Sequence, residues 1–207
     1  MWGENMENYK RILSNKRFRE SSIKRANLID DFYSDRSRIL YSSSFRRLQQ
    51  KAQVFSLEPN SSVRTRLTHS LEVSDLGRSI ANKIAYKLSQ KNILSVKNIP
   101  VFVSIVENAC LLHDIGNPPF GHFGESAIRN WANSINSQFL PKNVSWNKEL
   151  EKLLMDFKEF DGNPQGFRTV TKLHTDYDKY SLNLTYATLL CMIKYARAAG
   201  EKRGKES

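Results

Sequence analysis

The chain has 207 residues, of which 40% are apolar and 11% aromatic, which is enough for one globular domain with a buried core. Its formal net charge of +11 predicts an affinity for polyanions such as nucleotides or nucleic acid. Residues 1–51 contain twelve Lys or Arg against six Asp or Glu, and so carry six of the eleven net charges.

Other features of the composition restrict the class of protein. The two cysteines lie in separate apolar runs, so we expect buried free thiols and no disulfide framework. Residues 1–10 lack the apolar segment of a signal peptide. The longest apolar stretches, 101–112 and 187–193, are too short to span a bilayer. These features predict a cytoplasmic protein without a membrane partner.

In chain order, residues 1–29 are polar and basic and are expected to form an arm. A helical core is predicted for residues 30–195, because its apolar residues recur at helical spacing and no run alternates as a strand would. Residues 196–207 read as a basic tail. The predicted fold class is therefore all-α.

The segment 63–88 has a strong helical period. His69, Val73, Leu76 and Ile80 are spaced by four, three and four residues, so this stripe is expected to face the core. A single histidine on such a stripe is more often a packed core residue than a metal ligand.

A second histidine changes that interpretation. Val103, Val106, Cys110 and His113 are spaced by three, four and three residues, and Asp114 follows directly. A buried carboxylate needs a cation to offset its desolvation. Two inward histidines and one inward aspartate are what a divalent metal ion requires. The sequence therefore predicts a metal site at the end of the second helix.

The residues after Asp114 include two more functional candidates. Gly and Pro residues in the stretch 115–121 prevent a continuous helix, so a sharp turn is expected to bring His122 and Glu125 near the metal. Glu125 follows His122 by three positions, a spacing that lets the carboxylate orient the imidazole if the next helix has started. In the alternative interpretation, His122 only caps the next helix, whose expected buried face is Ile128, Trp131, Ile135 and Phe139. His174 lies in a polar context and is expected at the surface or in a loop.

The motif set resembles the bacterial deoxyguanosine triphosphate triphosphohydrolase family, within the HD-domain phosphohydrolases. The resemblance rests on four stretches in the family's order, over about residues 31–195: SSSFRRLQQKAQVF, VRTRLTHSLEV, HDIGNPPFGHFGE and FDGNPQGFR. It implies an HD-domain helical bundle that lacks its C-terminal part. The implied reaction is cleavage of a deoxynucleoside triphosphate, with dGTP favoured, to deoxynucleoside and inorganic triphosphate.

The resemblance also assigns residues. It implies a divalent ion, Mg²⁺ or Mn²⁺, held by His69, His113 and Asp114, and a catalytic pair, His122 and Glu125. It further implies that Arg66 contacts a substrate phosphate and that Gln53 lies beside the deoxyribose. Either action on the α-phosphate or proton supply to the leaving oxygen suits His122. By crowding the sugar, Gln53 would disfavour a 2′-hydroxyl.

The sequence departs from the family in one respect. The family has a fourth ligand, an aspartate on a helix far downstream, and neither Asp176 nor Asp178 matches it. The rival hypothesis is therefore a catalytically incomplete fragment that binds subunits or single-stranded nucleic acid, with stacking by Tyr41, Phe45 and Phe55. The resemblance also implies a homo-oligomer that responds to single-stranded DNA. An HD enzyme acting on another phosphoester is a third reading.

Overall fold

The computed structural model describes residues 12–53, 60, 62–136, 139–140, 145–175 and 180–194. In these ranges every regular element is helical, which confirms the all-α prediction, and one isolated bridge pairs Ala52 with Thr65. The elements are α2 (Leu28–Tyr41), α3 (Ser43–Arg46), η1 (Arg47–Gln50), α4 (Arg66–Gln90), η2 (Val96–Asn98), α5 (Ile99–Leu112), α6 (Gly121–Ser134), α7 (Lys148–Lys158), α8 (Gly162–Arg168), η4 (Thr169–Leu173) and α9 (Tyr186–Cys191).

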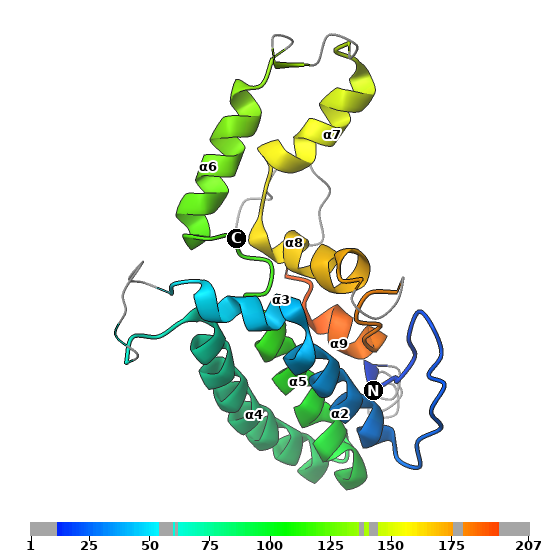
Figure 1. Cartoon of the computed structure of the whole chain (residues 1–207). Helices are drawn as coiled ribbons and strands as arrows, with labels where there is room; N and C mark the ends of the chain where they lie inside the picture. Colours follow the sequence, from blue (N-terminus) through cyan, green and yellow to red (C-terminus); the bar gives the residue numbers. More distant parts are fainter. Residues whose placement is uncertain are drawn as a thin grey trace.

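Helix α5 is the centre of the bundle. It is the most apolar of the longer helices, and α2, α4 and α9 all pack against it (Figure 1). Pro100 occupies its first turn, where the missing N–H costs nothing. Two apolar clusters lie along α5, one around Leu111 and Leu112 and one around Val101 and Ile105.

Helix α4 contacts α5 through small and polar residues. Its buried positions are Arg66, Ser70, Ser74, Ala81 and Ala85. A Cβ atom added at Gly77 would lie 2.5 Å from Sγ of Cys110, so the two helices approach closely there.

The predicted core-facing stripe on α4 is wrong for its central part. Leu76 is 61% exposed and Ile80 is 49% exposed. Helix α4 packs its small residues against α5. Leu76 and Ile80 therefore lie beside this contact and not within it. Similarly, Trp131 and Phe139 are exposed, contrary to the buried face predicted for the helix after His122.

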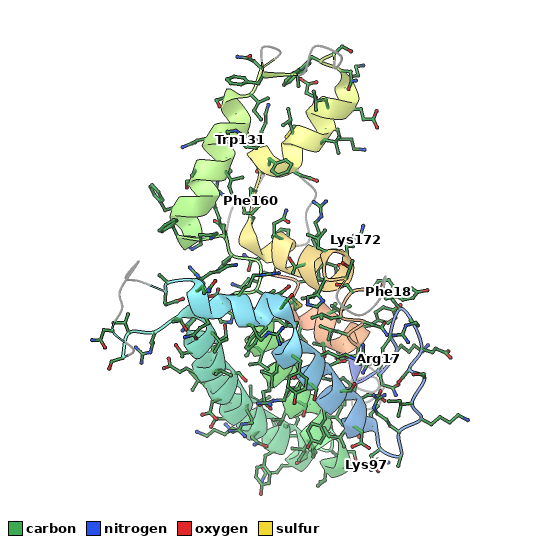
Figure 2. The ribbon with its side chains drawn as sticks, viewed as in Figure 1. Arg17, Phe18, Lys97, Trp131, Phe160 and Lys172 are labelled. Carbon is green, nitrogen blue, oxygen red and sulfur yellow. The ribbon has the colours of Figure 1, made fainter. Side chains whose placement is uncertain are left out.

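Helices α6 and α7 form an antiparallel pair that extends away from the bundle (Figure 1). Trp131 of α6 meets Phe157 of α7 edge to face, with ring centroids 6.2 Å apart. Figure 2 shows Trp131 on α6 and Phe160 just past the end of α7, where the chain returns toward α8.

The basic segment before α2 lies against the bundle. Figure 2 shows Arg17 on the α2 side of the molecule. Its Nη1 donates to Oδ1 of Asp35 at 2.6 Å and to the carbonyl of Asn183 at 2.7 Å. Asp35 is fully buried and also accepts hydrogen bonds from Thr185 and Thr188. This network joins the N-terminal segment, α2 and the start of α9.

The boundaries expected for the arm, core and tail stay a prediction. Residues 1–11 and 195–207 lie outside the described residues, as do Phe55, Asp176 and Asp178. Among the described residues, no helix is both long and apolar enough to cross a membrane.

We predict that Asp35→Asn lowers the free energy of unfolding by about 3–5 kcal/mol, because the buried Arg17 would lose its closer counter-ion and keep only Asp31, whose Oδ1 lies 3.5 Å from Nη2. Urea unfolding measures this change. The matched control is Glu72→Gln, which removes an exposed partner of Arg64 and should cost less than about 1 kcal/mol. Equal losses in the two variants would contradict the prediction.

Candidate functional site

The site lies where the start of α4 meets the end of α5. Thr65 caps α4 through its side chain, which accepts a hydrogen bond from the N–H of Thr68, and so fixes where the helix begins. His69 follows in the first turns of that helix. His113 is the C-terminal cap of α5, and Asp114 comes next. The antiparallel packing of α4 on α5 therefore brings these three side chains together.

Among the described residues, His69, His113 and Asp114 are the group able to hold a metal ion, with one ligand atom of each within 4.8 Å of the others. The two imidazole rings have centroids 5.2 Å apart. Nε2 of His113 lies 3.5 Å from Oδ1 of Asp114. Two imidazoles and one carboxylate are a donor set that suits divalent transition metals.

The hydrogen bonding of His113 suits it to the role of ligand. Its Nδ1 lies 2.8 Å from the carbonyl oxygen of Cys110, which can only accept, so Nδ1 carries the proton. The lone pair is therefore on Nε2, the nitrogen beside Asp114. A hydrogen bond of this kind sets the tautomer and ring orientation of a metal-binding histidine.

Asp114 is buried and has two hydrogen-bond donors. Nη1 of Arg66 donates to its Oδ2 at 2.7 Å, and Nδ2 of Asn117 donates to its Oδ1 at 2.6 Å. The Arg66 guanidinium passes over Gly121, where a Cβ atom would lie 2.5 Å from Nη2. Gly121 also has a φ of +54°, so glycine meets both requirements.

Lys51 is a second cation near this carboxylate. Its ammonium group donates to the carbonyl oxygen of Asn117 at 2.6 Å. Burial lowers the pKa of Lys51, and the positive charges of Arg66 and Arg47 lower it further, while Asp114 opposes them. The excess of positive charge makes this region suitable for a bound anion.

His122 and Glu125 form a separate pair at the start of α6. Nδ1 of His122 donates to Oε2 of Glu125 at 3.0 Å. The imidazole is 98% exposed, whereas the carboxylate is 8% exposed. Glu125 also accepts from the N–H of Gly162 at 2.9 Å. A buried, fixed carboxylate thus orients an imidazole whose Nε2 faces solvent, as a proton-transfer group requires.

The comparisons with known proteins agree with this geometry. The model of the HD domain family matches residues 66–179, which is 114 of the 207 residues. The chain belongs to the HD-domain family. Its helical bundle and its His–Asp doublet are thus those of an HD domain, as the sequence indicated.

Relatives narrow the resemblance. The chain is 44% identical over 192 residues to a deoxyguanosinetriphosphate triphosphohydrolase-like protein of Listeria monocytogenes, covering 89% of this chain and 41% of that protein. It is 44% identical over 191 residues to the deoxyguanosinetriphosphate triphosphohydrolase of Yersinia enterocolitica, covering 81% and 37%. The protein of that name from Serratia proteamaculans is 43% identical over 195 residues, with 83% and 37% covered. The chain thus spans about two fifths of the length of these relatives.

The remaining sequence-predicted site residue, Gln53, lies after η1 and before the residues that the HD domain model matches. Its Oε1 is buried and accepts no hydrogen bond from any residue that the structure describes. Nε of Arg66 is also buried, and it donates to no residue that the structure describes. Unsatisfied buried polar atoms are rare in proteins, and both of these belong to residues that the resemblance assigned to substrate contacts.

Expectations about two side chains need correction. His174 lies in the loop after η4, as one of its two predicted settings, but it is not at the surface: it is 3% exposed, with Nε2 3.5 Å from Oγ of Ser43. Phe45 is 3% exposed and packs in the core, so it cannot stack on a nucleic acid base. Tyr41 is exposed.

Three residues around the HD doublet were missed by sequence reasoning: Lys51, Asn117 and Gly162. Lys51 lies in the stretch SSSFRRLQQKAQVF and Gly162 in FDGNPQGFR, both of which carry the family resemblance. Asn117 follows Asp114 by three positions. Lys51 and Gly162 act through contacts with backbone atoms, which leave no side-chain pattern in a sequence, whereas the Asn117 amide donates to Asp114 three positions before it, a spacing that sequence reasoning could have used.

We predict that the chain binds Mn²⁺ and that His69→Ala and His113→Ala each weaken binding by more than about tenfold, because each removes one donor. Loss of the free Mn²⁺ signal in electron paramagnetic resonance measures binding. The control is His122→Ala, which should bind Mn²⁺ as the parent does. Unchanged binding in either ligand variant would disprove this metal site.

Proposed function

We propose that this chain carries the metal-dependent catalytic site of a deoxynucleoside triphosphate triphosphohydrolase, with dGTP as the favoured substrate. The observation that carries the proposal is the meeting of three metal-binding groups with two buried or half-buried cations and a separate His–Glu pair. The choice of substrate rests on the names of the relatives. We also propose a cytoplasmic location.

His69, His113 and Asp114 are the residues proposed to hold the divalent ion. When bound, such an ion neutralises charge on the α-phosphate and lowers the pKa of a water molecule. The donor set and the tautomer of His113 fit this role. Asn117 and Arg66 orient the Asp114 carboxylate by donating to its two oxygens.

Arg66 and Lys51 are the proposed phosphate contacts. Arg66 is buried and retains an unsatisfied Nε, so a phosphate oxygen can accept a hydrogen bond there. The Lys51 ammonium lies near the same carboxylate and has protons beyond the one given to Asn117. Both cations would compensate the charge of a triphosphate leaving group.

His122 is the proposed proton donor. In the reaction, a water oxygen bonds to the α-phosphorus, the bond from that phosphorus to the 5′ oxygen breaks, and the 5′ oxygen gains a proton. Glu125 accepts the Nδ1–H of His122, so the solvent-facing Nε2 takes a proton from solvent and delivers it to the 5′ oxygen, while the attacking water loses a proton to solvent. The 98% exposure of the imidazole leaves it accessible to substrate.

Partner proposals accompany this function. Exposed apolar side chains on α6 and α7, such as Trp131 and Leu153, suit a subunit contact in a homo-oligomer. Single-stranded DNA is a second proposed partner, on the basis of the net charge of +11 and the exposed Tyr41. Steep weakening of DNA binding with rising salt would support the DNA proposal.

We predict that the chain with Mn²⁺ releases triphosphate from dGTP and that His122→Ala reduces kcat by about 10²–10⁴-fold, because proton transfer is lost. Triphosphate is measured by anion-exchange chromatography. Mn²⁺ binding serves as the control for folding and should not change. Equal rates in parent and variant would refute the role of His122, and no release by a folded, Mn²⁺-binding parent would refute activity of this chain.

We predict that Gln53→Ala allows GTP to compete better with dGTP, because the side chain no longer crowds a 2′-hydroxyl. The ratio of kcat/KM for the two nucleotides measures this discrimination. Gln50→Ala, at the exposed end of η1, is the matched control and should keep the parental ratio. A Gln53→Ala variant that rejects GTP as well as the parent does would rule out the assignment.

A further inference from the structure

The first turn of α8 contacts both parts of the site. This helix belongs to the FDGNPQGFR stretch, 37 residues beyond Glu125. Gly162 is its first residue and is buried. The N–H of a first-turn residue has no partner within its own helix, so it is free to donate elsewhere.

Gly162 uses that N–H to hold Glu125. The N–H donates to Oε1 at 2.9 Å, while the other oxygen, Oε2, accepts from His122. Arg129 lies 3.8 Å from Oε2 and donates to the carbonyl oxygen of Phe160. With Oε1 fixed by a backbone donor, the carboxylate has one orientation, and that orientation presents Oε2 to the imidazole.

The missing side chain of Gly162 has a second consequence. A Cβ atom there would lie 2.2 Å from Oδ1 of Asn117 and 3.0 Å from Oε1 of Glu125. Asn117 is the residue whose Nδ2 donates to Asp114. Any side chain at position 162 would therefore push on the Asn117 amide and, through it, on the Asp114 carboxylate.

The backbone around Gly162 is held closely in place. A Cβ atom at Gly116 would lie 2.0 Å from the nitrogen of Gly166 and 2.2 Å from the carbonyl oxygen of Gly162. The loop after Asp114 thus packs backbone to backbone on the first turn of α8. Asp161 caps the helix by accepting from the N–H of Asn163 at 2.8 Å.

We propose that Gly162 is a positioning residue for the site, holding Glu125 through its N–H and leaving room for the Asn117 amide that holds Asp114. This inference rests on the proposed function for its catalytic meaning. The orientations of His122 and Asp114 that it concerns can be measured without substrate.

Two substitutions distinguish the role of the Gly162 N–H from the role of the space that its missing side chain leaves beside Asn117. Gly162→Ala keeps the N–H and adds a Cβ atom, whereas Gly162→Pro removes the N–H and places its ring Cδ where that N–H pointed at Glu125. Proline is favoured at the first position of a helix. Asp161 has φ −143° and ψ 132°, an extended conformation that is allowed before proline. The backbone therefore accepts proline, and the difference between the two variants reports the hydrogen bond.

The first measurement is the tautomer of His122 by ¹⁵N NMR, with the signal assigned from the His122→Ala spectrum. In the parent and in Gly162→Ala, we expect the proton on Nδ1, as the bond to Glu125 requires. In Gly162→Pro, we expect a shift toward the Nε2–H form and a fall in kcat of about 10–100-fold relative to Gly162→Ala. The same tautomer in both variants would overturn the role of the N–H.

The second measurement is Mn²⁺ affinity in a double-mutant cycle. Gly162→Ala is expected to weaken Mn²⁺ binding by about 10–100-fold in the parent, through Asn117. In an Asn117→Ala background the added Cβ atom has space, so Gly162→Ala should have no further effect. Equal losses in both backgrounds would overturn the role of the empty space. This cycle needs no proline variant, so it decides the question even where Gly162→Pro does not fold.

These readouts distinguish failure of this inference from failure of the proposed function. A chain that shows the expected His122 tautomers and the Mn²⁺ cycle but does not release triphosphate would retain the positioning role and lose the triphosphohydrolase proposal. A chain that hydrolyses dGTP but shows no difference between Gly162→Pro and Gly162→Ala would keep the function and lose this role of the Gly162 N–H.

Discussion

The close antiparallel contact of α4 with α5 is the constraint on which the site depends. The metal-binding groups come from residues 44 positions apart or more, His69 near the start of one helix and the His113–Asp114 doublet at the end of the other. They meet only because α4 presents serine, alanine and Gly77 to α5, so the helix axes approach closely. A larger residue at Gly77 would meet Cys110 and separate the two ends of the site. The packing of small residues is therefore required to bring the three metal-binding groups together.

The Asp114 carboxylate connects this helix pair to the rest of the site. Arg66 donates to one of its oxygens and Asn117 to the other. The backbone carbonyl of Asn117 in turn accepts a hydrogen bond from Lys51, and its side chain lies against Gly162 at the start of α8. Gly162 also donates to Glu125. The metal-binding group and the His–Glu pair are therefore joined by hydrogen bonds on either side of the packing contact between Asn117 and Gly162.

The sequence predicted the helical class and the meeting of two histidines with an aspartate, because histidines at helical spacing on apolar runs must come from two packed helices. It did not predict the buried face of α4. Helix α4 carries an apolar stripe at Leu76 and Ile80 and a small-residue face beside it, and only packing decides which one is covered. His174 was misplaced because polar neighbours in the chain do not reveal what covers a side chain from another element. Gly162 acts through a backbone N–H, which every residue except proline has, so its role was invisible in the sequence.

The charges around Asp114 explain why this region suits a polyphosphate. Burial lowers the pKa of Lys51, and the positive charges of Arg66 and Arg47 lower it further. Asp114 compensates only part of this positive charge, and it is also the carboxylate proposed to hold a cation. A metal ion bound there would increase the local excess of positive charge. An anion with several charges, placed beside Arg66 and Lys51, would reverse it and raise the pKa of Lys51 toward its ordinary value. Metal ion and triphosphate should therefore bind with mutual support, because each offsets the electrostatic cost of the other.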